Sequence, residues 1–235
     1  MKRVMFENSA DLKRQLIVFD LDGTLVDSLP VLTFCVNRMR SERGLTALAS
    51  DQIAGMSGGP MHGFLRRAVS IGGPESKASD EEIGCEYGGH YRRACRSGLM
   101  RAYTGTEAML RAITEAGHAI AICTNKSQAL ALVTTEVCGF KKYFSEANVI
   151  GCDTLPRVKP DPMPMEWLMA RAAISPPDCW MVGDSAVDMA LARNAGAHAV
   201  AIEYGYGQAS AFHPDARMTT PADLLTILGI KPSAI

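Results

Sequence analysis

Short apolar runs that alternate with stretches of helical periodicity constrain the fold of this chain more than any other feature. The five runs are LIVF (16–19), AIAIC (119–123), NVIG (148–151), CWMV (179–182) and AVAI (199–202). The stretches that repeat apolar residues at helical spacing are 106–117, 127–139, 163–174 and 186–196. Runs this short and apolar are typical of strands buried on both faces. Alternating strands and helices therefore predict an α/β fold with a Rossmann-like parallel sheet covered by helices on both faces.

One interval breaks this alternation, because it contains no convincing strand. Its helical stretches are 30–44, 61–73 and 80–98, separated by segments that contain glycine. An interval of about 70 residues is too long for an ordinary crossover between two parallel strands. The sequence therefore predicts an all-helical cap domain at 29–99, inserted into a core made of residues 1–28 and 100–235.

The balance of charge and the use of cysteine exclude several classes of protein. The 235-residue chain has 24 basic and 25 acidic side chains, so no overall field attracts nucleic acid or an anionic membrane. Its seven cysteines are an odd number without a CxxC pair, which is typical of reduced cytoplasmic thiols. No run is long enough for a membrane span or for the apolar part of a signal peptide. We expect a cytoplasmic protein without nucleic-acid or membrane partners, as a monomer or a homodimer.

Polar side chains follow the first four runs, at the points where the predicted strands end. They are Asp20 and Asp22 after the first run, Thr124, Asn125 and Lys126 after the second, Lys159 in the loop beyond the third, and Asp184, Ser185 and Asp188 after Gly183, which follows the fourth. Ligands of open parallel sheets bind beyond the carboxyl ends of the strands, so these side chains are expected at one rim. Clustered carboxylates repel one another, and a hard divalent cation such as Mg²⁺ relieves that repulsion, particularly beside a phosphate group.

The spacing of Asp20 and Asp22 suits the transfer of a phosphoryl group. Residues two apart on an extended strand face the same side, so both carboxylates can reach one cavity. One can attack phosphorus while the other gives a proton to the departing oxygen. Each feature alone has a simpler explanation, such as a DxD turn, a Thr-Asn helix cap, a solvated Lys159 or a Gly-Asp-Ser turn. Their joint occurrence, each at a predicted strand end, favours the catalytic interpretation.

These motifs resemble those of the haloacid dehalogenase superfamily, and more closely those of its phosphoglycolate phosphatase-like branch. The matching segments are DLDGTLVDS (20–28), TNK (124–126), KPDP (159–162) and VGDSAVDM (182–189). The resemblance covers nearly the whole chain, from about Leu16 to Gly229. It implies a Rossmann-like core with a mobile helical cap of the C1 type, inserted between the first and second strands.

The resemblance also implies a role for each matching residue at the reaction centre. Asp20 would be the nucleophile that forms an aspartyl-phosphate, and Asp22 would be the general acid and then the general base. Thr124 and Asn125 would hold phosphate oxygens. Lys159 would neutralise charge on the nucleophile and on the phosphate.

The cofactor that the resemblance implies is Mg²⁺. The ion would be held by Asp20, by the backbone carbonyl of Asp22 and by Asp184. Asp188 would be a supporting or water-mediated partner, so all four acidic residues are expected at the metal site.

The substrate that the resemblance implies is a small phosphomonoester, and 2-phosphoglycolate is the first candidate. Within the insertion, AGMSGGPMHGF (54–64) resembles a specificity loop, whose glycine-rich turn at Gly58 could present backbone amides to a substrate carboxylate. Arg66 follows this loop and could pair with the same carboxylate through two hydrogen bonds. A solvated surface arginine is the simpler interpretation of Arg66 taken alone.

Other functions stay open on the same four segments. The substrate could be a sugar phosphate, a nucleotide or pyrophosphate, and a phosphomutase would use the same residues but return the phosphoryl group to an intermediate. A phosphonatase would need a lysine in the insertion, where Lys77 is the only one and sits in a loop-like segment. A non-catalytic protein would be expected to lack one of Asp20, Asp22, Lys159 or Asp184, and all four are present.

Overall fold

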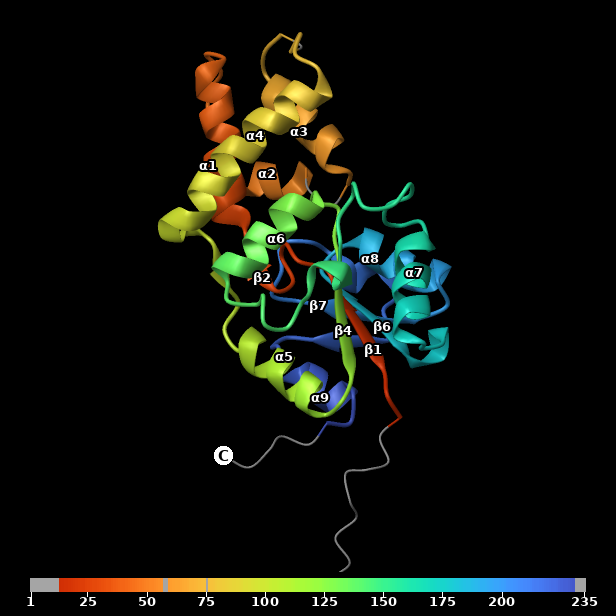
Figure 1. The fold of residues 1–235 in the computed structure, drawn as a ribbon. Coiled ribbons are helices and arrows are strands. Elements are labelled where there is room, and N and C mark those ends of the chain that lie inside the picture. The colour runs from red at the N-terminus through yellow and green to blue at the C-terminus, as the bar shows by residue number, and fades with distance from the viewer. Residues whose placement is uncertain (1–12, 57–58, 75, 231–235) are drawn as a thin grey trace, which may run out of the picture.

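Six parallel strands lie at the centre of the molecule in the order β5-β4-β1-β6-β7-β8 (Figure 1). The computed structural model describes residues 13–56, 59–74 and 76–230. The strands are β1 (Leu16–Phe19), β4 (Ala119–Cys123), β5 (Val149–Ile150), β6 (Cys179–Gly183), β7 (His198–Ile202) and β8 (Ala216–Met218). All five predicted runs form strands, and the predicted α/β fold is confirmed. The edge strand β8 has no counterpart among the predicted runs, because its three residues include the exposed Arg217.

Strand β1 occupies the middle of this sheet. All four of its residues are buried, and they pair in parallel register with both β4 and β6. The chain continues from β1 to β4 and β5 on one side, and from β6 to β7 and β8 on the other. The strand order reverses beside β1, and ligands of open sheets bind at the carboxyl ends of strands at such a point. Residues directly after β1, β4 and β6 therefore lie at one rim.

Side chains that alternate along the strands divide the core into two layers. One hydrophobic cluster takes Ile17 and Phe19 from β1, and the other takes Leu16 and Val18. The first layer is covered by α5 (Thr106–Glu115), α6 (Gln128–Val137) and α9 (Asp223–Ile227), and the second by α7 (Met163–Ala172) and α8 (Ala186–Asn194). Neighbouring strand residues face opposite sides, so this division means that the sheet is buried on both faces.

Helices are the only regular elements in the described part of 29–99, which we call the helical cap. They are α1 (Leu29–Glu42), α2 (Ser50–Met56), α3 (Met61–Ser70), α4 (Asp80–Ala94) and the π turn η2 (Cys95–Leu99). The cap lies beyond the carboxyl ends of the strands (Figure 1). Helix α2 has no counterpart among the predicted stretches, because its seven residues include Gly55 and bury only Ile53. The domain boundaries at residues 29 and 99 stay a prediction.

Two short strands connect the helical cap with the core. β2 (Val26–Asp27) and β3 (Arg101–Ala102) pair antiparallel where the chain enters the cap and where it leaves it. Each of these strands has two residues, one of which is charged, so neither forms an apolar run in the sequence. Their pairing holds the two connecting segments side by side.

Three short 3-10 turns border the strands of the sheet. They are η3 (Glu146–Asn148) before β5, η4 (Pro176–Asp178) before β6 and η5 (Ala209–Phe212) after β7. Across the described ranges, no helix combines the length and the apolar content that crossing a membrane requires.

Candidate active site

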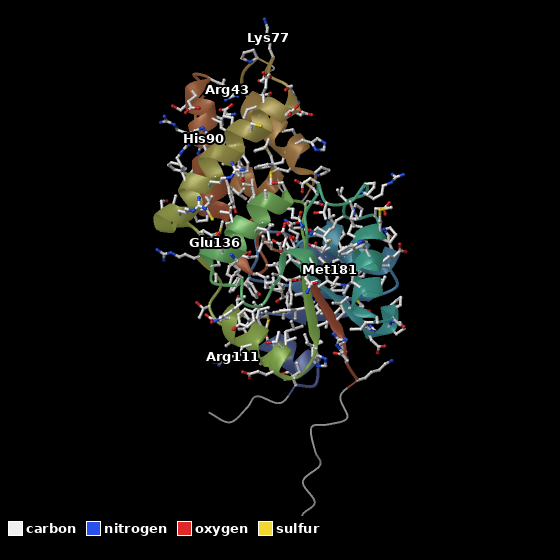
Figure 2. All side chains as sticks on the ribbon, in the orientation of Figure 1. Arg43, Lys77, His90, Arg111, Glu136 and Met181 are labelled. Atoms are coloured by element: carbon white, nitrogen blue, oxygen red, sulfur yellow. The ribbon has the colours of Figure 1, made fainter. Side chains whose placement is uncertain are left out.

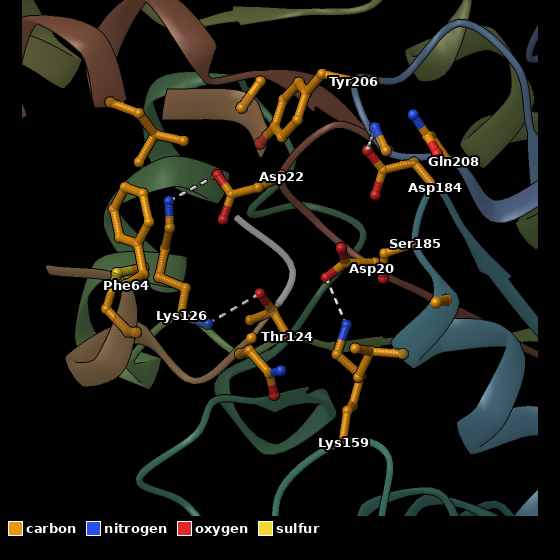
Figure 3. A pocket seen from close by; sticks show the side chains of 18 of the residues that line it. Asp20, Asp22, Phe64, Thr124, Lys126, Lys159, Asp184, Ser185, Tyr206 and Gln208 are labelled. Carbon is orange, nitrogen blue, oxygen red and sulfur yellow. Dashed lines mark hydrogen bonds and ion pairs between the residues drawn. The ribbon is translucent and has the colours of Figure 1, made fainter. Parts of the chain in front are cut away.

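A cavity of about 480 Å³ lies between the strand ends and the helical cap (Figure 3). Its walls bring together six residues predicted from the sequence, namely Asp20, Asp22, Thr124, Asn125, Lys159 and Asp184. The cap contributes apolar side chains, among them Leu32, Met61 and Phe64. This volume is large enough for a small metabolite.

Two further predicted site residues, Asp188 and Arg66, are not among the residues that line this cavity. Asp188 is fully buried beneath it. The guanidinium group of Arg66 pairs with Asp80 and with backbone carbonyls of the same cap segment, so this arrangement does not bring Arg66 to the cavity. Gly58 lies outside the described residues.

The backbone after β1 explains why two carboxylates and a glycine follow an apolar strand. The Asp20 N–H donates to a carbonyl of β6 at 2.9 Å, which extends the ladder by one residue. Leu21 is fully buried, whereas Asp20 and Asp22 line the cavity, as alternation along an extended chain requires. Gly23 has a φ of 76°, and a Cβ there would lie 2.2 Å from a carboxylate oxygen of Asp184. Both conformation and space therefore require glycine at this position.

Lys159 is a buried cation held between two carboxylates. Its Nζ lies 2.7 Å from Asp188 Oδ1 and 2.9 Å from Asp20 Oδ1. Burial alone would lower the pKa of Lys159, but Asp188 and Asp20 raise it above its ordinary value, so the ammonium stays charged. Asp188 is itself fixed as the partner of Ser185 in a capping box at the start of α8. Lys159 is thereby directed at Asp20.

Three carboxylate groups lie close together at this site, and carboxylate oxygens are the ligands that a hard cation prefers. Ligand atoms of Asp20, Asp184 and Asp188 lie within 4.8 Å of one another. Burial raises the pKa of Asp20 to about 6, against the effect of Lys159. Burial, followed by the charges of Asp20 and Asp188, raises the pKa of Asp184 to about 8. Asp20 Oδ1 is buried within ion-pair distance of Lys159 but without hydrogen-bond geometry, so it keeps lone pairs for a ligand. Such a donor set fits Mg²⁺.

Glycines hold the loop after β7 against Asp184. The Gly207 N–H donates to Asp184 Oδ2 at 2.9 Å. A Cβ on Gly207 would lie 2.1 Å from the Asp184 carbonyl oxygen, and one on Gly205 would lie 2.5 Å from Asp184 Cβ. The YGYG sequence at 204–207 therefore fixes the orientation of a candidate metal ligand.

Replacement of Gly207 by alanine tests this close contact. We expect the free energy of unfolding to fall by about 1–3 kcal/mol, because the added methyl group forces Asp184 and the loop apart. Urea denaturation measures the change. The matched control is Gly84→Ala in α4, where a Cβ meets nothing within 4 Å and alanine favours the helix. Equal stability losses in the two variants would contradict the account of Gly207.

Thr124 and Asn125 occupy the rim after β4. The Thr124 N–H donates to the Ile150 carbonyl at 2.9 Å, and the Thr124 hydroxyl accepts a hydrogen bond from the Lys126 N–H at 3.2 Å. The side-chain oxygen of Asn125 is buried and has no hydrogen-bond partner among the described residues. Both residues line the cavity, where the Thr124 hydroxyl and the Asn125 side-chain NH2 group can donate to the oxygens of an anion.

Lys126 also lies at this site, although the sequence pattern alone indicates no role for it. Its side chain is completely buried, and its Nζ donates to Asp22 Oδ1 at 2.7 Å and to the Tyr91 hydroxyl at 2.6 Å. Burial alone would lower the pKa of Lys126, but the Asp22 carboxylate raises it above its ordinary value. Its position directly after Thr124 and Asn125 was the only signal for it in the sequence.

Comparison with known proteins identifies the class to which this fold and site belong. A family model described as haloacid dehalogenase-like hydrolase matches residues 17–202. The chain therefore belongs to the haloacid dehalogenase-like hydrolase family.

Relatives within this family are similar over most of their length. The chain is 33% identical over 222 residues to a phosphoglycolate phosphatase of Chromobacterium violaceum, covering 90% of this chain and 95% of that protein. It is 30% identical over 223 residues to a phosphoglycolate phosphatase of Vibrio parahaemolyticus, covering 92% and 97%. A crystal structure described as a predicted phosphoglycolate phosphatase from Haemophilus somnus superposes with a TM-score of 0.82 at 27% identity, covering 91% and 97%.

Proposed function

We propose that this protein is a Mg²⁺-dependent phosphatase that hydrolyses a small phosphomonoester, with 2-phosphoglycolate as the first candidate. The position of Asp20 carries this proposal, because it follows β1 directly, lines the cavity and lies 2.9 Å from Lys159. A buried nucleophilic carboxylate needs a compensating positive charge, which Lys159 supplies. Relatives that are named phosphoglycolate phosphatase and match about nine-tenths of the chain support the substrate class.

The reaction then has two steps on Asp20. In the first step, a carboxylate oxygen of Asp20 attacks phosphorus, the bond to the substrate oxygen breaks, and Asp22 gives its proton to that oxygen. In the second step, the Asp22 carboxylate takes a proton from water, whose oxygen attacks phosphorus and releases phosphate from Asp20. With a pKa of about 6, Asp20 is mostly ionised at neutral pH, as a nucleophile must be.

The remaining rim residues bind the phosphoryl group. Thr124 and Asn125 are placed to donate hydrogen bonds to its oxygens, and the Lys159 ammonium offsets its negative charge. Asp20, the backbone carbonyl of Asp22 and Asp184 would hold Mg²⁺, with Asp188 supporting through Lys159 and Ser185. When bound, the ion withdraws charge from the non-bridging phosphate oxygens.

The structure disfavours two of the competing functions, and a kinetic test distinguishes the third. Lys77, which a phosphonatase would need, is exposed at the far tip of the helical cap (Figure 2). A phosphomutase would use the same cavity, and dependence of turnover on a bisphosphate activator would distinguish it. A non-catalytic role is disfavoured because Asp20, Asp22, Lys159 and Asp184 all line one cavity.

The described wall of the helical cap carries no charged side chain. It consists of Leu32, Ala54, Gly55, Gly59, Met61 and Phe64. Recognition of a carboxylate on this side would therefore rest on backbone N–H groups rather than on Arg66. Phe212 adds a partly exposed ring at the core side of the cavity. These apolar walls favour, as a second candidate, a phosphomonoester with a longer apolar alcohol.

Two small substrates decide between these candidates. We expect kcat/KM for 2-phosphoglycolate to exceed that for 2-phosphoethanol by at least about tenfold, because a site that binds a carboxylate rejects the analogue without it. Steady-state phosphate release with Mg²⁺ present measures both values. Equal values would discard carboxylate recognition, and faster turnover of longer alkyl phosphates would then support the second candidate.

The proposal includes a cytoplasmic location. All seven cysteines are free thiols, and four of them are buried. Free thiols in this number are typical of a reducing compartment.

A further inference from the structure

A chain of buried hydrogen bonds leads from Asp22 into the helical cap. Lys126 Nζ lies 2.7 Å from Asp22 Oδ1 and 2.6 Å from the hydroxyl of Tyr91, which belongs to α4 of the cap. The Tyr91 hydroxyl lies 2.8 Å from the hydroxyl of Thr134, which belongs to α6 of the core. Lys126, Tyr91 and Thr134 are all buried, so water does not compete for these contacts.

The directions of these hydrogen bonds follow from the number of protons available. The Thr134 hydroxyl donates its one proton to the Leu130 carbonyl at 2.9 Å. It therefore accepts from the Tyr91 hydroxyl, which in turn accepts from Lys126. Lys126 thus donates both to Tyr91 and to Asp22. A lysine held in this way has a single position, although its side chain has four rotatable bonds.

Only one oxygen of the Asp22 carboxylate is bound by Lys126. Oδ1 receives the hydrogen bond, while the second oxygen points away from the lysine (Figure 3). The Asp22 side chain keeps 17% of its surface exposed, and Asp22 lines the cavity. Fixing one oxygen fixes the rotation of the carboxylate, and small errors in the placement of a reacting group cause large losses in rate.

We propose that Lys126 is a positioning residue, held by Tyr91 of the cap, that aims the free oxygen of Asp22 at the leaving group of the substrate. The inference rests on the proposed function, in which Asp22 gives a proton to that leaving group. It also makes the position of the acid depend on the seating of α4 against the core, because Tyr91 belongs to the cap and Lys126 to the core.

Two substrates with different leaving groups test this role in Lys126→Met. The alkoxide of 2-phosphoglycolate needs a proton as it departs, whereas p-nitrophenolate is a stable anion and leaves without one. We expect kcat for 2-phosphoglycolate to fall by about 10²-fold, and kcat for p-nitrophenyl phosphate to fall by less than about tenfold. KM for both should change little, because the Lys126 ammonium is already bound to Asp22 and Tyr91.

Tyr91→Phe keeps the ring and removes only the hydroxyl, so we expect it to fold even if Lys126→Met does not. It should reduce kcat for 2-phosphoglycolate by about threefold to tenfold, and kcat for p-nitrophenyl phosphate should stay nearly the same. The matched control is Lys142→Met, since Lys142 is an exposed lysine paired with Glu107. This variant should leave kcat for both substrates unchanged.

The outcomes separate this inference from the proposed function. Equal losses on both substrates in Lys126→Met, or no loss on either, would overturn the positioning role while the phosphatase assignment stands. Wild-type kcat for both substrates in Tyr91→Phe would contradict the inference that the cap holds Lys126 in place. Wild-type protein that hydrolyses neither substrate would instead refute the proposed function.

Discussion

Replacement of Asp20 by asparagine is expected to abolish phosphatase activity while the protein stays folded. An amide cannot form the covalent bond to phosphorus that a carboxylate forms, so kcat should fall by at least about 10⁴-fold. Asp20 is buried beside Asp184 and Asp188, and its neutralisation removes repulsion among them. Lys159 keeps Asp188 as a partner. The thermal unfolding temperature should therefore stay the same or rise.

A second aspartate provides the matched control for this experiment. Asp178 directly precedes β6, so it lies at the amino-terminal end of this strand, whereas the cavity lies at the carboxyl ends of the strands. It pairs with Lys13. Asp178→Asn should retain activity within about twofold of the wild type, since it touches nothing at the site. Phosphate release under saturating 2-phosphoglycolate measures both variants. More than about a hundredth of wild-type turnover in Asp20→Asn would remove the nucleophile assignment.

The sequence allowed the core of the site to be predicted because of one rule of sheet geometry. Asp20, Thr124 and Asp184 directly follow the strands β1, β4 and β6, and parallel strands end at the same rim. Strand position alone is enough to place such residues together. The short strands β2, β3 and β8 escaped prediction because each contains a charged residue, namely Asp27, Arg101 or Arg217, and so none of them forms an apolar run.

The helical cap was predictable only as a set of helices. The period of α4 shows which residues share a face, but it does not show that Tyr91 meets Lys126, which lies 35 positions later in the chain. The pairing of Arg66 with Asp80 could not be predicted either, because the two residues are 14 positions apart and the sequence does not specify the conformation of the loop between them. Contacts between helices depend on packing angles and loop conformations, which single-sequence patterns do not specify.

Removal of Mg²⁺ is the second change expected to have a large effect. Chelation with EDTA should reduce kcat by at least about 10³-fold and reversibly, because charge on the phosphoryl oxygens is then left uncompensated beside Asp20 and Asp184. Re-addition of Mg²⁺ should restore the rate. Activity that persists through thorough chelation would overturn the metal assignment.

The raised pKa values of Asp184 and Asp20, about 8 and about 6, predict how Mg²⁺ binding depends on pH. A carboxyl group with a raised pKa in the folded state keeps a proton that the unfolded chain has lost. Stability of the metal-free protein therefore declines as pH rises from the ordinary value of 3.8 towards 8. Protons also compete with the metal for the same oxygens, so affinity for Mg²⁺ increases over this interval.

The stabilisation that Mg²⁺ confers should accordingly be larger at about pH 8 than at about pH 5, where Asp184 and Asp20 are mostly protonated. Thermal unfolding with and without the ion, followed by circular dichroism, measures this difference without relying on activity. Asp184→Asn should lose the gain at both pH values, whereas Asp178→Asn should keep it. An equal gain at both pH values would mean that the ion binds elsewhere, since only oxygens that exchange protons for metal can produce the difference.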